Sequence, residues 1–159
     1  MTNPMDALVK LQLAIDRGQL TLQPADVYPT LGLWMDEVGG TTRFTFAKVD
    51  SGKVQAIAMF VHAGEINAAP CFQTGYAVIE SVRQMGLASD LVAKGIEEMR
   101  HGLGRHGVAV FYVEAVVGEG NTASHRLATR LISATPERIT DAFSGEAALR
   151  YLKRVNCSR

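Results

Sequence analysis

The chain has 159 residues, which predicts a single domain. Hydrophobic residues make up 47% of the sequence and charged residues 20%, a composition that excludes a disordered chain, a collagen-like repeat and a low-complexity array. Acidic and basic residues are equal in number, 16 of each, so the chain lacks the broad positive field that binds nucleic acid or anionic membrane. We therefore expect neither of these as a partner.

The cysteines and the hydropathy of the chain indicate the cellular compartment in which we expect the protein. Cys71 and Cys157 are too few for a disulfide scaffold and lack a Cys-x-x-Cys spacing, which predicts reduced thiols. The chain opens without a basic region leading into an apolar stretch. Its most apolar run, residues 108–117, is shorter than the ~20 residues of a membrane span. These features predict a cytoplasmic protein.

The N-terminal part predicts two helices within about residues 4–38, followed by strands. Residues 4–17 form an amphipathic pattern that ends at Gly18, with Ala7, Leu8, Leu11 and Ile15 on one face. A weaker helical pattern over about 24–38 rests on Val27, Leu31 and Met35. The period then changes to two, so residues 43–49 and 53–62 predict a hairpin, and a third strand follows over about 71–79.

The C-terminal part predicts a β-α-β unit and a closing hairpin. Residues 86–103 carry the clearest helical periodicity, and the apolar run 108–117 is typical of a strand covered on both faces. Such a unit crosses over right-handedly into a parallel pair. Residues 121–131 predict a short helix, and 138–155 a hairpin, with a helix over 147–153 as the alternative. The fold class is α/β (α+β), with a mixed sheet.

Three patterns that suggest chemistry have simpler interpretations. The run Gly102 to Gly107 matches G-x-G-x-x-G, but it follows a helix and precedes a strand, which favours a helix end and a turn. The four histidines have no metal-ligand spacing, so no metal is expected. Glu97 and Glu98 are adjacent and do not face each other on a helix, which predicts a solvated face.

The junction between the third strand and the clearest helix carries a motif. In the run Val78-Ile79-Glu80-Ser81-Val82-Arg83-Gln84-Met85-Gly86-Leu87-Ala88-Ser89, the residues Arg83, Gly86 and Ala88 match the pattern Arg/Gln-x-x-Gly-x-Gly/Ala. This resembles the acyl-CoA-binding segment of the GNAT superfamily of N-acyltransferases. The family's second signature, Asn-x-x-Ser opening the next helix, resembles Asn121 to Ser124. The resemblance spans roughly residues 43–155.

Elementary physics favours the same site. Peptide N–H groups at a helix start bind anions, and Gly86 lets the backbone approach a diphosphate without a Cβ in the way. The resemblance implies a single GNAT-like domain over residues 1–159, in which two parallel strands splay apart around the pantetheine arm of acetyl-CoA. The expected cofactor-binding residues are Val78, Ile79, Arg83, Gln84, Met85, Gly86, Leu87, Ala88, Ser89, Asn121 and Ser124.

The catalytic residues are expected near the end of the third strand. Amine acylation benefits from a base, and the candidates are Glu114, which resembles the family's strand glutamate, and Glu80. The Ile79 N–H is expected to meet the oxyanion. Many family members carry a tyrosine as general acid where this chain has Ala128. Ser124, Tyr76 and Tyr151 are substitutes that the sequence does not rank.

The resemblance implies an N-acetyltransferase that moves an acetyl or short acyl group from acetyl-CoA to an amine of a small molecule, peptide or protein. The alternative is a CoA-binding sensor or interaction module that has lost turnover, which the alanine at position 128 favours. The family resemblance is compatible with a homodimer. The sequence leaves the acceptor and the acyl chain length open.

Overall fold

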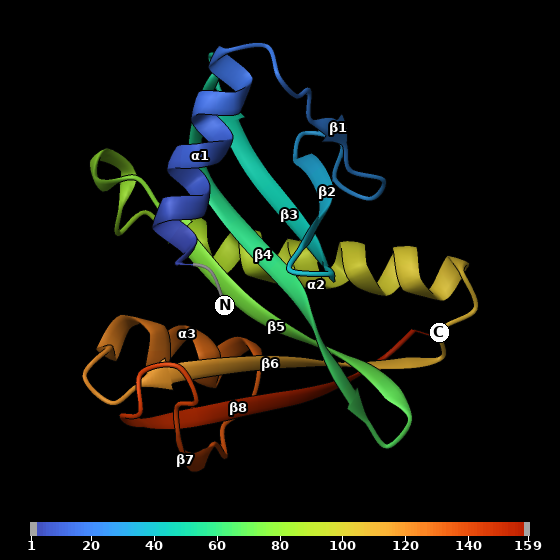
Figure 1. Cartoon of the computed structure of the whole chain (residues 1–159), viewed down its shortest axis with the longest axis vertical. Helices are drawn as coiled ribbons and strands as arrows, with labels where there is room; N and C mark the ends of the chain where they lie inside the picture. The colour runs from blue at the N-terminus through green and yellow to red at the C-terminus, as the bar shows by residue number, and fades with distance from the viewer. Residues whose placement is uncertain (1–2, 158–159) are drawn as a thin grey trace.

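The computed structural model describes residues 3–157, which form one α/β domain built on a mixed sheet (Figure 1). The eight strands of this part of the chain run in the order β1-β2-β3-β4-β5-β6-β8-β7. The elements are α1 (Pro4–Asp16), β1 (Gln23–Pro24), β2 (Gly32–Val38), β3 (Thr41–Asp50), β4 (Lys53–Ile66), β5 (Ala69–Val78), the 3-10 helix η1 (Glu80–Val82), α2 (Leu87–Arg105), β6 (Val110–Gly118), α3 (Thr122–Leu131), β7 (Glu137–Thr140) and β8 (Ala147–Asn156).

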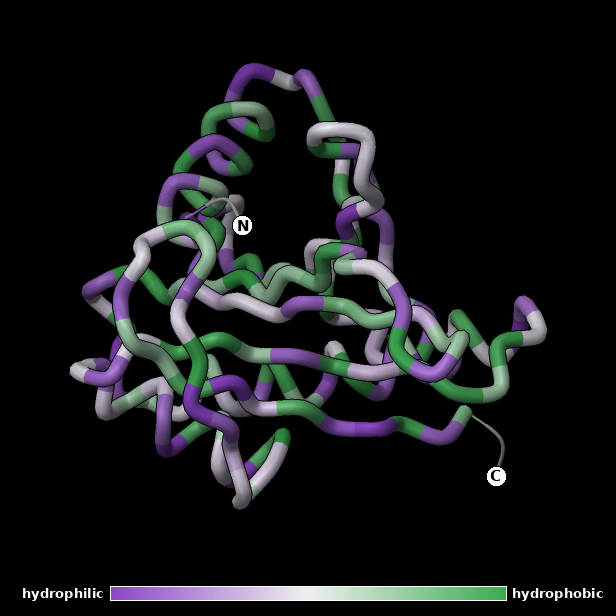
Figure 2. Tube along the Cα trace, turned by 60° about the horizontal axis from the view of Figure 1, so that its bottom comes forward, coloured by the Kyte–Doolittle hydropathy of each residue, from purple (hydrophilic) through white to green (hydrophobic). Residues whose placement is uncertain are grey.

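Helix α1 covers one face of the sheet, as the amphipathic pattern predicts. The Asn3 side chain caps its start by accepting hydrogen bonds from the N–H groups of Met5 and Asp6, at 2.9 and 3.3 Å. Its buried residues Leu8 and Leu11 pack in one cluster with β4. Figure 2 shows the matching alternation of hydrophobic and hydrophilic residues along the coil of α1.

The second predicted helix, over about residues 24–38, is wrong. This segment contains the end of β1 and all of β2, and β2 pairs antiparallel with β3 from Gly32 to Val38. Pro29 lacks a backbone N–H and disfavours helical backbone at Tyr28. Val27 and Met35, two of the three residues on which the prediction rested, are 42% and 60% exposed. Pairing with the neighbouring strand therefore outweighs a weak helical spacing.

Helices α2 and α3 cover the other face and enclose the larger core, and α2 crosses behind β3, β4 and β5 in Figure 1. The buried face of α2 includes Leu91, Val92, Ile96 and Met99. Gly95 lies against the Phe60 ring of β4, where an added Cβ would come within 2.7 Å of a ring carbon. The absence of a side chain at this position lets the helix approach the sheet closely.

The prediction that Glu97 and Glu98 both lie on a solvated face is wrong for Glu98. Glu97 is partly exposed and accepts a hydrogen bond from Arg100 at 2.6 Å. Glu98 is only 6% exposed, and its carboxylate accepts four hydrogen bonds of 2.6–3.1 Å from the N–H groups of residues 26–28. The side chain therefore ties the segment before β2 to helix α2.

Strands β5 and β6 are the one parallel pair of the described sheet, which confirms the predicted β-α-β unit. Their pairing covers only three positions and ends at Gln73 and Glu114. Beyond that point they diverge toward the left of Figure 1. The predicted C-terminal hairpin is also confirmed, because β7 pairs with β8 and β8 with β6, and the alternative helix over 147–153 is wrong.

The two faces of strand β6 are buried to different extents. Phe111, Val113, Ala115 and Val117 join the core under α2 and α3. On the other face, Tyr112 is buried while Glu114 and Val116 are partly exposed, so the predicted cover on both faces is complete on one face and partial on the other. None of the helices within residues 3–157 is both long and apolar enough to cross a membrane.

Candidate functional site

The connection from β5 to α2 forms a compact loop with an uncapped helix start. Gln84 and Gly86 both adopt left-handed backbone, with φ of 62° and 76°. Gly86 is the N-cap of α2, and no side chain caps the first turn. The N–H groups at the start of this 19-residue helix are therefore available to an anion, together with the positive end of the helix dipole.

A cavity of about 690 Å³, here named the loop cavity, opens at this helix start. Its charged lining residues are Arg83, Arg126 and Arg130, and the part of the chain that the structure describes brings no carboxylate to it. Arg83 donates a hydrogen bond from Nε to the Val78 carbonyl at 3.0 Å. Arg130 donates to the Ser89 hydroxyl and so joins α3 to the first turn of α2. The lining thus has the charge that a phosphorylated ligand requires.

A second cavity of about 350 Å³, the strand cavity, lies where β5 and β6 diverge. It is lined by β5 from Gln73 to Tyr76, by β6 from Ala115 to Gly118, by α3 and by Asp141 and Phe143 of the β7–β8 turn. The start of α1 also contributes, because Asn3 and Pro4 line both cavities. The two cavities share lining residues and therefore meet within one site.

Tyr76 and Ser124 stand where the two cavities meet. The Tyr76 and Ser124 hydroxyl oxygens are 2.5 Å apart and share a hydrogen bond between β5 and α3. Asn121 caps α3, since its side chain accepts a hydrogen bond from the Ser124 N–H at 3.1 Å. All three residues line both cavities. The site therefore places a phenol between the arginine-lined end and the gap in the sheet.

The structure brings most of the predicted cofactor-binding residues to the loop cavity, namely Val78, Arg83, Gln84, Gly86, Leu87, Ala88, Ser89, Asn121 and Ser124. Met85 is 69% exposed and lines neither cavity. Ile79 and Glu80 also lie outside both linings. Most residues of the motif therefore line the loop cavity as expected, whereas Met85 is exposed outside it.

The role predicted for the Ile79 N–H needs correction. This group donates to the Gln55 carbonyl of β4 at 2.9 Å, so it points away from the gap. Hydrogen-bonding directions alternate along an antiparallel ladder. The N–H groups of Val78 and Tyr76 therefore point toward the gap instead.

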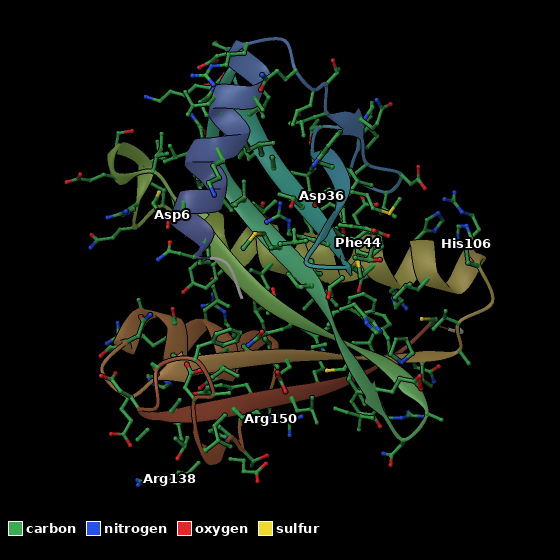
Figure 3. The ribbon with its side chains drawn as sticks, in the orientation of Figure 1. Asp6, Asp36, Phe44, His106, Arg138 and Arg150 are labelled. Atoms are coloured by element: carbon green, nitrogen blue, oxygen red, sulfur yellow. The ribbon has the colours of Figure 1, made fainter. Side chains whose placement is uncertain are left out.

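Glu114 lies at the last position at which β6 pairs with β5, and its side chain is 16% exposed. Its carboxylate accepts a hydrogen bond from Arg150 Nε at 2.5 Å, and this contact raises the pKa of Arg150. Figure 3 shows Arg150 on β8. The nearby Cys71 thiol is buried, and burial together with the Glu114 charge raises its pKa to about 11. Neither Glu114 nor Cys71 lines the cavities, and a thiol of this pKa is a poor nucleophile at neutral pH.

The histidines have different partners, and His101 lies 4.0 Å from the Asp26 carboxylate. His125 shares a hydrogen bond with the buried Tyr151 at 2.9 Å, His62 stacks edge-on against Phe72, and His106 stands at the far end of α2 (Figure 3). Within residues 3–157, His, Cys, Asp and Glu side chains form no group of three or more with the geometry of a metal site.

Sequence reasoning missed several lining residues. Arg126 and Arg130 follow the second motif by helical spacing, so their position near that motif was a usable signal. Asp141, Phe143 and the start of α1 carry no such signal. They are brought to the site by the order of the strands and by the packing of α1 on β4.

Comparison with solved structures shows the fold. No protein-family model matches the chain, and no curated protein matches it in sequence. Solved structures do match. They include a GNAT-family acetyltransferase from Streptococcus pneumoniae (TM-score 0.54, 13% identity, 72% of this chain and 67% of that one) and the ribosomal L7/L12 alpha-N-protein acetyltransferase RimL in complex with coenzyme A (0.55, 16%, 73% and 64%).

A ribosomal-protein-alanine N-acetyltransferase from Brucella melitensis also matches (TM-score 0.52, 19% identity, 71% of this chain and 69% of that one). The chain thus spans about two thirds of the length of the structures that it matches. This chain has an eight-stranded mixed sheet with one parallel pair among its described residues, and helices on both faces. The protein therefore has the fold of the GNAT acetyltransferases.

Proposed function

We propose that this protein transfers an acyl group, with acetyl as the simplest case, from acyl-CoA to a primary amine in the cytoplasm. One observation carries the proposal: the uncapped start of α2 and three arginines face a cavity that continues into the gap between β5 and β6. The diphosphate of coenzyme A is matched by the helix start, and its thioester arm by the gap. RimL, which shares the fold, was solved with coenzyme A.

The proposed reaction forms a C–N bond and breaks a C–S bond. The amine nitrogen attacks the thioester carbonyl carbon, loses a proton, and displaces sulfur as a thiolate. The Val78 and Tyr76 N–H groups face the gap about 7 Å apart along the strand, so one of them supplies the oxyanion donor in place of Ile79. The Tyr76 hydroxyl donates the proton that the sulfur takes up, and the phenolate regains it from solvent.

We infer that Glu114, rather than Glu80, is the base. Glu114 precedes Ala115, a lining residue of the strand cavity, and its side chain is mostly buried. Glu80 is exposed in η1 and lies outside both linings. Because Glu114 does not itself line the gap, we propose that it takes the proton through an intervening water.

The Gly86→Glu variant tests the donor site. A carboxylate at this position faces the diphosphate, so we expect at least a tenfold loss of CoA affinity in calorimetry. Gly86→Ala is the matched control. It carries the same left-handed strain of about 1 kcal/mol without the charge, and an added Cβ there meets no atom within 4 Å. Equal CoA affinity of the two variants would mean that the diphosphate binds elsewhere.

A second experiment separates an enzyme from a binding module. Thiol release from acetyl-CoA is measured with a library of amines, on protein whose CoA binding has been established. Amine-dependent thiol release supports transfer. CoA binding without any amine-dependent release is the outcome expected of a module that has lost turnover.

A further inference from the structure

Charge is divided between the two ends of the site. Among the described residues, the loop cavity is lined by three arginines and no carboxylate, whereas the one charged residue that lines the strand cavity is Asp141. No Lys, Arg or His within residues 3–157 lines the strand cavity. An anionic donor and a cationic acceptor are therefore matched to opposite ends of one site.

The β7–β8 turn holds Asp141 in a defined position. Its N–H donates to the Glu146 carbonyl at 2.8 Å, and its own carbonyl accepts from the Gly145 N–H at 2.8 Å. One carboxylate oxygen, Oδ1, accepts from the Phe143 N–H at 2.9 Å. The side chain is thus fixed by the turn that also presents Phe143.

Two further features of the strand cavity point to a ligand. Phe143 lines the cavity and is nevertheless 83% exposed, so a large apolar surface stands at its rim. Thr74, 8% exposed on β5, also lines the cavity, and its buried hydroxyl oxygen has no hydrogen-bond partner among the described residues. Buried hydroxyls are normally satisfied, so this one marks a place for a polar group that the free chain does not supply.

We propose that the acceptor is a primary ammonium group on an apolar body, with no carboxylate next to the nitrogen. Asp141 binds the ammonium group, and Phe143 covers the apolar body. A free amino acid is disfavoured because its carboxylate would lie near Asp141 without a cation to pair with. This inference rests on the proposed function, because it assigns the acceptor end of the same site.

The experiment measures amine binding to protein saturated with CoA, which permits no transfer. CoA binding is first confirmed by calorimetry, and its failure would count against the proposed function itself. Phenethylamine, phenylalanine amide and phenylalanine are then titrated below neutral pH, where all three carry an ammonium group. We expect the first two to bind at least tenfold more tightly than phenylalanine, which alone carries the carboxylate.

The source of the amine is read from the same titrations. Tighter binding of phenethylamine indicates a small-molecule amine, and tighter binding of the amide indicates a peptide N-terminus. If phenylalanine bound as tightly as phenethylamine and phenylalanine amide, the proposal would be overturned. So would the absence of amine binding to protein that has taken up CoA.

Two variants test whether Asp141 causes the preference for phenethylamine over phenylalanine. Asp141→Asn retains an oxygen that accepts the Phe143 N–H, so the turn persists while the charge is removed. We expect it to bind phenethylamine at least tenfold more weakly and to lose its preference over phenylalanine. Glu146→Gln removes a charge from the same turn outside the cavity lining, and it should leave both affinities unchanged. A preference that survives Asp141→Asn would refute the assignment.

Discussion

The position of Tyr76 favours it as the general acid. Its hydroxyl is bonded to Ser124 at the meeting point of the two cavities. Tyr151, which the sequence left as an equal candidate for the general acid, is 2% exposed, bonded to His125 and outside both linings. The small Ala128 lines the strand cavity and has no hydroxyl to offer. The geometry therefore favours Tyr76.

Replacing Tyr76 with phenylalanine should lower kcat roughly tenfold or more at neutral pH, with little change in CoA affinity. The deficit should shrink as the pH rises above ~8.5, because a thiol of that pKa then leaves as a stable thiolate. The measurement is the pH profile of thiol release. Tyr151→Phe is the control and should keep the profile of the unaltered protein. A deficit that does not vary with pH would argue against proton donation by Tyr76.

Glu98 is a residue whose importance is structural. Glu98→Ala leaves the N–H groups of residues 26–28 without their carboxylate, and we expect it to lower the free energy of unfolding by about 3 kcal/mol. Glu97→Ala, one position away, removes only a partly exposed ion pair with Arg100 and should cost less than about 1 kcal/mol. Urea unfolding of both variants checks the difference. Equal losses would contradict the role assigned to Glu98.

At the scale of elements, the close contact between α2 and β4 positions the donor loop. Gly95→Ala places a methyl group 2.7 Å from a Phe60 ring carbon, so the helix or the ring must shift. We expect a loss of stability of about 1–3 kcal/mol and weaker CoA binding, because the start of α2 moves with the helix. Urea unfolding and calorimetry measure the two effects.

Gly102→Ala on the same helix is the matched control for that substitution. An added Cβ at Gly102 meets no atom within 4 Å, so the variant keeps only the gain in helix propensity, up to about 1 kcal/mol. It should therefore be as stable as the unaltered protein or more so. If Gly95→Ala were equally stable, the close approach of α2 to the sheet would not be a constraint.

The local sequence determines the conformation of some elements more strongly than that of others. Helix α1 has an N-cap, an apolar stripe and a glycine after its end, and these signals agree. Strand β2 lacks such agreement, and its pairing with β3 decides its conformation. The glutamate pair on α2 illustrates the same limit, since adjacent residues of equal polarity have different partners once the segment before β2 packs against the helix.

At the scale of the whole molecule, a net charge of zero conceals a separation of charge along the site. Among the described residues, arginines line the loop cavity and a single carboxylate, that of Asp141, lines the strand cavity. The overall balance correctly argues against a broad positive field, but it says nothing about such a local division. The division arises because α3 and the β7–β8 turn reach the same gap from different parts of the chain.

The sequence by itself determined helices α1, α2 and α3, strand β6, the hairpin of β3 and β4, the fold class and the loop at the start of α2, because each rests on local periodicity, turn residues or a contiguous motif. It left β8 open between a strand and a helix. Only the tertiary structure decided that the Ile79 N–H points away from the gap, that the Tyr76 hydroxyl bonds to that of Ser124, and that Asp141 lines the strand cavity. These facts depend on strand register and on contacts between residues far apart in the chain, and a residue's own neighbours in sequence do not encode them.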